Sequence, residues 1–127
     1  MVAQVLECLM DEARLLDLIN AAWDRMSFPE KKLWEAVHVS PEKWSLAHGG
    51  KNTDAFWVVA LIGPTVIWYN HVEEGFNRSR FDRYGEIAEY GSNQFDLEEA
   101  LRYVLNQLKA GYALEPRSGA PIPGEFK

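Results

Sequence analysis

The chain contains one cysteine, no long hydrophobic run and a deficit of basic residues, and each scarcity excludes something. Cys8 alone cannot form an intrachain disulfide, which is typical of a reducing compartment. The longest apolar run, Ala55 to Ile62, is far shorter than the roughly 20 residues of a membrane-spanning helix. The first residues, Met1 to Gln4, lack the basic region of a secretory signal. We therefore expect a cytoplasmic protein that does not bind membranes.

Acidic residues outnumber basic ones, with 19 Asp and Glu against 13 Lys and Arg, so the formal net charge is -6. Nucleic-acid binding rests on clustered Lys and Arg, so this balance argues against nucleic acid as the partner. An acidic surface instead favours basic partners and speeds encounter with them.

No motif for catalysis, metal binding or nucleotide binding is recognisable. His38, His48 and His71 are far apart, and none has a second His or Cys at ligand spacing. Gly49-Gly50-Lys51 precedes a predicted strand, whereas a phosphate loop follows a strand and opens a helix. We expect no catalytic residue, no metal and no cofactor. A small-ligand or metal-dependent enzyme is the least favoured alternative.

The length of 127 residues and the 47% apolar content fit a single domain with one core. The patterning predicts an α+β fold, mainly helical over 1–50, with strands and a loop over 54–91. A further helix is expected over 96–111 and an extended tail over 116–127, which is rich in Pro and Gly.

Apolar residues at steps of three and four predict a long first helix between Val2 and Met26. Its expected buried stripe is Val2, Leu6, Leu9, Ala13, Leu16, Ile19, Trp23 and Met26.

Ser27-Phe28-Pro29-Glu30 predicts a capping box, with the serine as N-cap and the glutamate reaching back to it. The second helix that it opens is expected to end near Val39. Ser40-Pro41-Glu42 then predicts a short turn or helix that carries Trp44 and Leu46.

Ala55–Ile62 is short, β-branched and aromatic, which predicts a strand covered on both faces. The turn residues Gly63-Pro64-Thr65 and the apolar run Val66–Asn70 complete a predicted hairpin. Glu86–Tyr90 alternates polar and apolar residues, as in a half-exposed third strand. Asp96-Leu97-Glu98-Glu99 predicts a capping box for the last helix, with Gly111 as its stop.

The predicted architecture is a small antiparallel sheet of about three to four strands, packed with N-terminal and C-terminal helices. In this architecture the last helix buries Leu97, Leu101, Val104, Leu105 and Leu108.

The segment from His71 to Glu99 has eight acidic and three basic residues, so it carries -5 of the chain's -6 charge. Exposed tyrosines among arginines and carboxylates are typical of protein interfaces, and we expect Tyr69 and Tyr84 to be exposed. A nucleic-acid site and a plain solvated surface are the alternatives for this segment. The predicted partner-binding residues are Tyr69, Glu73, Glu74, Arg78, Asp82, Tyr84, Glu86 and Glu89.

The stretch from Val66 to Asn77, followed by Ser79, Tyr84-Gly85-Glu86-Ile87 and Asn93-Gln94, resembles a group of small bacterial proteins. These proteins share the pattern WYN-x-x-EEGFN-x-S, then YG-x-I, then NQ. Several look like immunity proteins encoded beside polymorphic or contact-dependent toxins. The resemblance covers roughly residues 55 to 108. Where related sequences often read YND, this chain has Asn70-His71 and so lacks a carboxylate.

The resemblance implies a small, cytosolic, non-enzymatic protein that neutralises a toxin by direct binding. Immunity proteins of this kind are often acidic because many of their target toxins are basic nucleases. We therefore expect a protein partner, a basic toxin domain, and a chain that is a monomer or homodimer. A structural or self-associating domain is the alternative.

Overall fold

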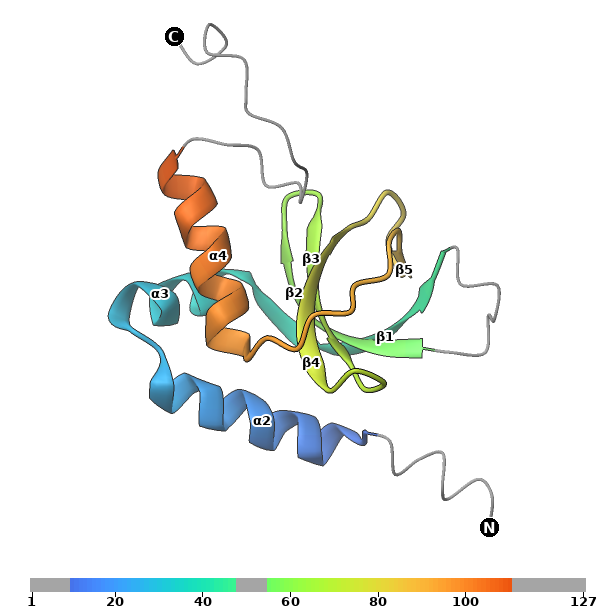
Figure 1. Cartoon of the computed structure of the whole chain (residues 1–127), viewed down its shortest axis with the longest axis horizontal. Helices are drawn as coiled ribbons and strands as arrows, with labels where there is room; N and C mark the ends of the chain where they lie inside the picture. The colour runs from blue at the N-terminus through green and yellow to red at the C-terminus, as the bar shows by residue number, and fades with distance from the viewer. Residues whose placement is uncertain (1–9, 48–54, 111–127) are drawn as a thin grey trace, which may run out of the picture.

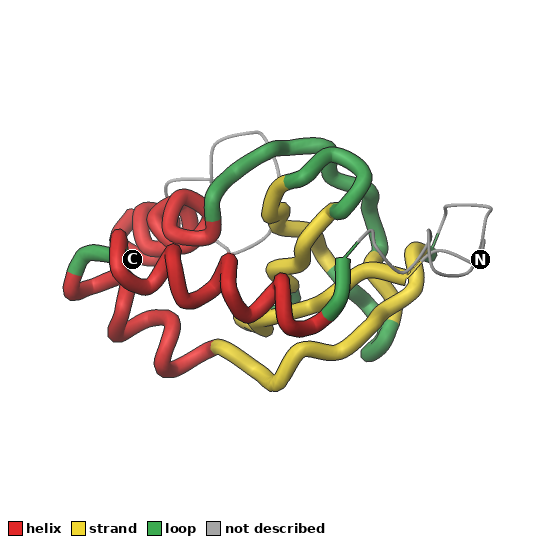
Figure 2. The backbone as a smooth tube through the Cα atoms, turned by 90° about the horizontal axis from the view of Figure 1, so that it is seen from below, coloured by secondary structure: helices red, strands yellow, loops and turns green. Residues whose placement is uncertain are grey.

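The computed structural model describes residues 10–47 and 55–110, which form an α+β fold. Figure 1 shows the helices gathered on one side of a curled sheet, and Figure 2 shows the same separation from below. The elements, in chain order, are α2 (Glu12–Arg25), α3 (Phe28–Val37), β1 (His38–Leu46), β2 (Ala55–Ile62), β3 (Thr65–Asn70), β4 (Gly75–Arg80), β5 (Glu86–Ile87) and α4 (Leu97–Ala110).

The sheet has five strands in the order β4-β3-β2-β1-β5. Its first four strands are antiparallel, while β5 pairs with β1 in parallel, through Ser45 with Glu86 and Leu46 with Ile87. The predicted combination of a small sheet with helices is confirmed. The expectation of a purely antiparallel sheet of three to four strands is corrected to a mixed sheet of five.

Each face of the sheet covers its own core, because successive side chains on a strand point to opposite faces. Facing the helices are Trp57 and Val59 of β2 with Ile67 and Tyr69 of β3. The opposite face forms a second core of Trp44, Phe56, Val58, Val66, Trp68 and Ile87. The strand Ala55–Ile62 is therefore covered on both faces, as its apolar sequence predicts.

Within the described residues, the predicted first helix corresponds to α2, which begins at Glu12. Asp11 is the N-cap of α2, and its carboxylate accepts a hydrogen bond of 2.8 Å from the backbone N–H of Arg14. The buried positions are Leu15, Ile19 and Ala22, whereas Leu16 of the predicted stripe is 41% exposed. Ile19 and Met26 of the predicted stripe are buried and Trp23 packs against the core, so this half of the stripe is confirmed, whereas Leu15 is buried in place of its neighbour Leu16. The predicted residues before Met10, Cys8 among them, lie outside the described residues.

The capping box of α3 is confirmed. Ser27 accepts from the backbone N–H of Glu30 at 3.3 Å, and Glu30 accepts from the backbone N–H of Ser27 at 3.0 Å. The next prediction is wrong, since Ser40-Pro41-Glu42 lies within strand β1 instead of a turn or helix. The pairing with β2 is irregular between His38 and Glu42, and such bulges accommodate a proline that has no N–H to donate.

Strand β4 was not predicted, and β5 is shorter than the predicted strand Glu86–Tyr90. After Ile87 the chain turns away, because the N–H of Ala88 donates to the carbonyl of Arg80 at 3.0 Å. At the start of α4, Glu99 accepts from the N–H of Asp96 at 2.8 Å, as a capping box predicts.

The expected apolar face of α4 is only partly buried. Leu97, Leu101 and Val104 are buried, but Leu108 is 45% exposed. Gly111, the tail and the Gly49-Gly50-Lys51 turn lie outside the described residues.

Candidate protein-binding surface

Two exposed tyrosines lie at the border of the second core, on the sheet face that carries no helix. Tyr84 is 65% exposed and packs on Trp44, with ring centroids 4.8 Å apart. Tyr90 is 47% exposed, and its ring centroid lies 6.1 Å from that of Trp68. We call this surface the tyrosine face and define it by Tyr84, Tyr90, Glu42 and Glu73.

A carboxylate holds each tyrosine hydroxyl. The hydroxyl of Tyr84 donates to both carboxylate oxygens of Glu42, at 2.6 and 2.8 Å. The same carboxylate accepts from the indole N–H of Trp44 at 3.0 Å. The hydroxyl of Tyr90 donates to Glu73 at 3.4 Å, a longer bond of the same kind. Both rings are therefore fixed at their polar ends as well as by packing.

Two groups of ring contacts lie beneath the tyrosine face. Phe56 contacts Trp68 edge to face, with centroids 5.0 Å apart, and His71 stacks on Phe56 at 4.9 Å. Phe81 meets Trp44 edge to face at 5.2 Å. Aromatic pairs at these separations are favourable beyond the area they bury, so this support is stiff.

The hydrogen bonds to Glu42 fix the ionisation of the pair. Donation from the indole of Trp44 and from the hydroxyl of Tyr84 lowers the pKa of Glu42. The same carboxylate raises the pKa of Tyr84. At neutral pH the glutamate is therefore charged and the tyrosine keeps its proton.

The chain that follows β4 carries Tyr84 and Tyr90 and also several charged side chains. Arg80 forms ion pairs with Asp82 at 3.5 Å and with Glu89 at 3.4 Å. Each exposed pair contributes only about 0–1 kcal/mol, so these contacts organise the segment more than they stabilise it. With Glu86 and Arg83 included, residues 80–89 contain three carboxylates and two guanidinium groups.

A buried asparagine clasp fixes the chain that carries Tyr90. Asn77 donates to the carbonyl of Asn93 at 2.9 Å and accepts from its N–H at 2.8 Å. Asn70 donates to the carbonyl of Gly91 at 2.8 Å and accepts from the N–H of Val72 at 2.9 Å. Both clasp asparagines are completely buried, so they position the surface without being part of it.

Two glycines leave room for the clasp. A Cβ on Gly91 would lie 2.6 Å from the side-chain oxygen of Asn77, and one on Gly75 would run into the backbone of Gln94. Asn70, Gly75, Asn77 and Asn93 all belong to the string for which the sequence predicts a resemblance to immunity proteins. That string therefore describes a structural clasp more than a binding surface.

The structure separates the eight predicted partner-binding residues into two groups. Glu73 and Tyr84 belong to the tyrosine face, while Asp82, Glu86 and Glu89 follow β4 in the chain. Glu86 is next to Ile87 of the second core, so its side chain points to the other face of the sheet. The helix side of the sheet has Tyr69, Glu74 and Arg78.

The expectation that Tyr69 is exposed is wrong, because this tyrosine is only 7% exposed and packs in the helix-side core. Arg78 is half-buried, stacks 4.0 Å above the ring of Tyr103 and donates to Gln107 at 3.2 Å. It stabilises the contact between β4 and α4.

Sequence reasoning missed Glu42 and did not assign Tyr90 to the site. Glu42 lies 42 residues before Tyr84, in a segment predicted to be a turn or helix. The strand alternation of Glu42 and Trp44 was the available signal, but Pro41 obscured it.

Among the described residues, no three His, Cys, Asp or Glu side chains converge as a metal site. None of the helices in the described part of the chain is long and apolar enough to cross a membrane. Comparisons with protein-family models, with curated proteins and with solved structures give no match. The chemistry of the surface itself must therefore carry the functional argument.

Proposed function

We propose that this chain is a non-enzymatic protein-binding module of the immunity type, which neutralises a toxin by binding it through the tyrosine face. The observation that carries the proposal is the pair of exposed, anchored tyrosines, Tyr84 on Glu42 and Tyr90 on Glu73. Exposed aromatic rings that the protein already holds in place are the usual centres of protein interfaces.

Anchoring lowers the entropic cost of association. Immobilising a mobile side chain at an interface costs about 0.5–1.5 kcal/mol. Tyr84 is held at its hydroxyl by Glu42 and along its ring by Trp44 before any partner arrives. A partner that covers this ring gains apolar burial without that cost.

Charge selects the kind of partner. Glu42 and Glu73 accept hydrogen bonds from the tyrosine hydroxyls, and the segment that carries both tyrosines adds Asp82 and Glu89. A positively charged surface would be steered toward this region, and association would slow as salt screens the charges. This selection fits the basic toxin domain that the resemblance implies.

Self-association through the sheet is less favoured, because both of its edges are obstructed. The outer edge of β4 bonds to the following chain, with the N–H of Phe76 donating to the carbonyl of Phe95 at 2.9 Å. The outer edge of β1 pairs with β5 at Ser45 and Leu46, and its open part contains Pro41. Such edges resist pairing with a second sheet.

The proposal requires a basic toxin domain encoded beside this gene, and finding none there would count against it. With that domain as partner, the charge reversals Asp82→Lys and Glu89→Lys are expected to slow association several-fold at low salt and to leave the fold intact. Asp24→Lys is the matched control, because Asp24 is an exposed acid on α2, away from the tyrosine face. Unchanged association rates for both reversals would remove this face from the proposal. A tight oligomer that buries Tyr84, seen by light scattering across concentrations, would favour the self-associating alternative.

A further inference from the structure

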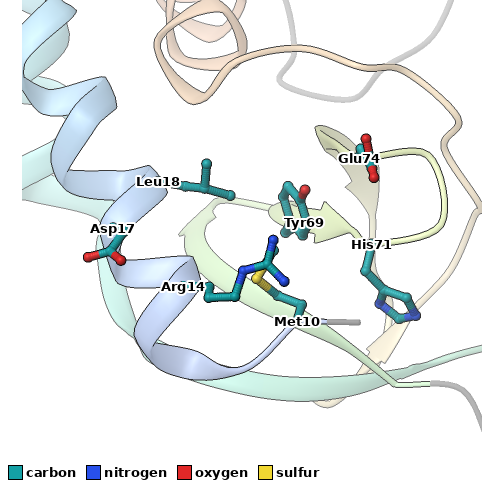
Figure 3. Close-up of a pocket in the computed structure, with 7 residues that line it drawn as sticks. All are labelled: Met10, Arg14, Asp17, Leu18, Tyr69, His71 and Glu74. Atoms are coloured by element: carbon teal, nitrogen blue, oxygen red, sulfur yellow. The ribbon is translucent and has the colours of Figure 1, made fainter. Parts of the chain in front are cut away.

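A recess lies on the helix side of the sheet, where the start of α2 meets the turn between β3 and β4. Its volume is about 310 Å³, within the range of small-ligand sites. Figure 3 shows the side chains that line it. They are Met10, Arg14, Asp17, Leu18, Tyr69, His71 and Glu74.

Opposite charges stand on opposite walls of this pocket. Arg14 extends from α2 toward Tyr69 and His71, while Glu74 stands on the hairpin turn beyond them (Figure 3). Asp17 also borders the pocket, but its carboxylate points away from the other side chains. The charged groups at this pocket are thus one guanidinium and one carboxylate, while the imidazole of His71 stacks on Phe56.

The phenol of Tyr69 lies between these charges. Burial raises the pKa of Tyr69, the charge of Glu74 raises it further, and the charge of Arg14 opposes the rise. Both charged groups are therefore within electrostatic reach of the tyrosine hydroxyl. A hydroxyl can donate to an anion and accept from a cation, so it suits a ligand that carries both.

Apolar surface completes the lining. Met10 and Tyr69 are buried, and Leu18 points toward the tyrosine ring in Figure 3. A ligand with a short hydrocarbon side chain would have van der Waals partners here.

Glu74 is held in an uncommon backbone conformation. It has a φ of 60°, and it is the one non-glycine residue with positive φ in the described part of the chain. A left-handed conformation disfavours most L residues and often marks functional positions. Glycine would relieve the strain at this turn but would remove the carboxylate from the pocket.

We propose that this pocket binds a small zwitterion of the α-amino-acid type, with its carboxylate beside Arg14, its ammonium beside Glu74 and an apolar side chain against Met10 and Leu18. The site is separate from the toxin-binding role, and neither proposal depends on the other.

The test is an NMR titration of the ¹⁵N-labelled full chain with leucine, N-acetylleucine and leucinamide. The two analogues lack the ammonium and the carboxylate, respectively. Leucine is expected to shift the amides of Tyr69, His71 and Glu74 and to bind at least about tenfold more tightly than either analogue, since each loses a charge-assisted hydrogen bond. Equal affinity for N-acetylleucine, or no saturable shift with leucine, would overturn the proposal.

Substitutions assign the two charges. Glu74→Gln is expected to weaken leucine binding to the level of N-acetylleucine, and Arg14→Gln to the level of leucinamide. Asp24→Asn is the matched control on the same helix, and it should keep leucine affinity within about twofold because Asp24 is exposed and does not line the pocket. The amide spectra of the free variants report whether the fold is retained. A folded Glu74→Gln variant that binds leucine like the original chain would refute the assignment.

Discussion

Tyr84 and Glu42 are 42 residues apart in the sequence, yet the tyrosine hydroxyl donates to both oxygens of the glutamate, at 2.6 and 2.8 Å. The bond joins the segment after β4 to strand β1. The ring of Tyr84 packs on the buried indole of Trp44, and the N–H of that indole donates to Glu42. The exposed ring of Tyr84 and the carboxylate of Glu42 are thus held in fixed positions, as the proposed binding through the tyrosine face requires.

The ionisation of Glu42 reports this arrangement directly. Tyr84→Phe removes one of the two donors that lower the glutamate's pKa, so we expect that pKa to rise part of the way toward its ordinary value. The indole of Trp44 remains as a donor, so the recovery is incomplete. Carbon-detected NMR titration of the carboxyl measures the change. An unaltered pKa in the variant would show that the hydroxyl does not bind Glu42 in solution.

The same shift gives a pH dependence of stability. The pKa of Glu42 is lower in the folded state, so its contribution is present above the ordinary glutamate pKa of roughly 4.3. It is lost as the pH falls through the folded-state value. The difference in unfolding free energy between the original chain and Glu42→Gln should therefore shrink from pH 6 toward about pH 3. A difference that grows on acidification would have the wrong sign for this account.

The asparagine clasp should be a major source of local stability. Asn77→Ala removes three hydrogen bonds, one of them a long bond to Gly75, and leaves the N–H and carbonyl of Asn93 without their partner, which we expect to cost roughly 2–4 kcal/mol. Urea unfolding of the two proteins measures the loss.

Glycine substitutions at the clasp provide a graded comparison. Gly75→Ala should be more disruptive than Gly91→Ala, because the new methyl meets backbone at Gln94 in the first case and a side chain in the second. The opposite order would contradict the close approach of the two segments.

A single buried hydrogen bond supports the second core. The indole N–H of Trp68 donates to the hydroxyl of Ser79 at 3.0 Å, and both side chains are buried. Ser79→Ala leaves this N–H without its acceptor and should destabilise the fold by about 1–3 kcal/mol. Ser45→Ala is the control, because its hydroxyl makes only a long 3.5 Å bond to Gly85. Equal losses in thermal or urea unfolding would speak against a specific role for Ser79.

Glu74 is expected to lower the stability of the fold through its left-handed conformation while supplying a carboxylate to the pocket. Glu74→Gly removes the left-handed strain at φ 60° and is expected to stabilise the chain by about 1 kcal/mol. The same substitution should abolish the preference for leucine over N-acetylleucine in the pocket. Lower stability of the glycine variant would show that the side chain of Glu74 stabilises the turn.

Caps, turns and apolar periodicity, which involve residues close together in the sequence, correctly predicted several helices and strands. The Ser27 capping box, the strand Ala55–Ile62 and the hairpin to Asn70 follow from turn and cap chemistry, and the structure has all three. The helix Leu97–Ala110 follows from apolar periodicity.

Elements stabilised by distant contacts were missed. The sequence of strand β4 looks like a polar loop because it contains Asn77, Arg78 and Ser79. In the structure, Asn77 and Ser79 are buried with hydrogen-bond partners, and Arg78 stacks on the ring of Tyr103. Strand β1 looks like a helix start because of Pro41, and its pairing with β5 joins residues about 40 positions apart. The position of Glu42 in the site depends on both strands, so no local pattern predicted it.

The most direct test of the binding proposal compares three alanine variants for affinity to the partner that the proposal requires, a basic toxin domain encoded beside this gene. Tyr84→Ala and Tyr90→Ala remove the anchored rings. Tyr103→Ala is the control, since Tyr103 is 47% exposed, as is Tyr90, but lies on α4. Calorimetry should show at least about a tenfold loss of affinity for the first two variants and little change for the control. Full affinity in both face variants, with a loss in Tyr103→Ala, would contradict the tyrosine face as the binding surface.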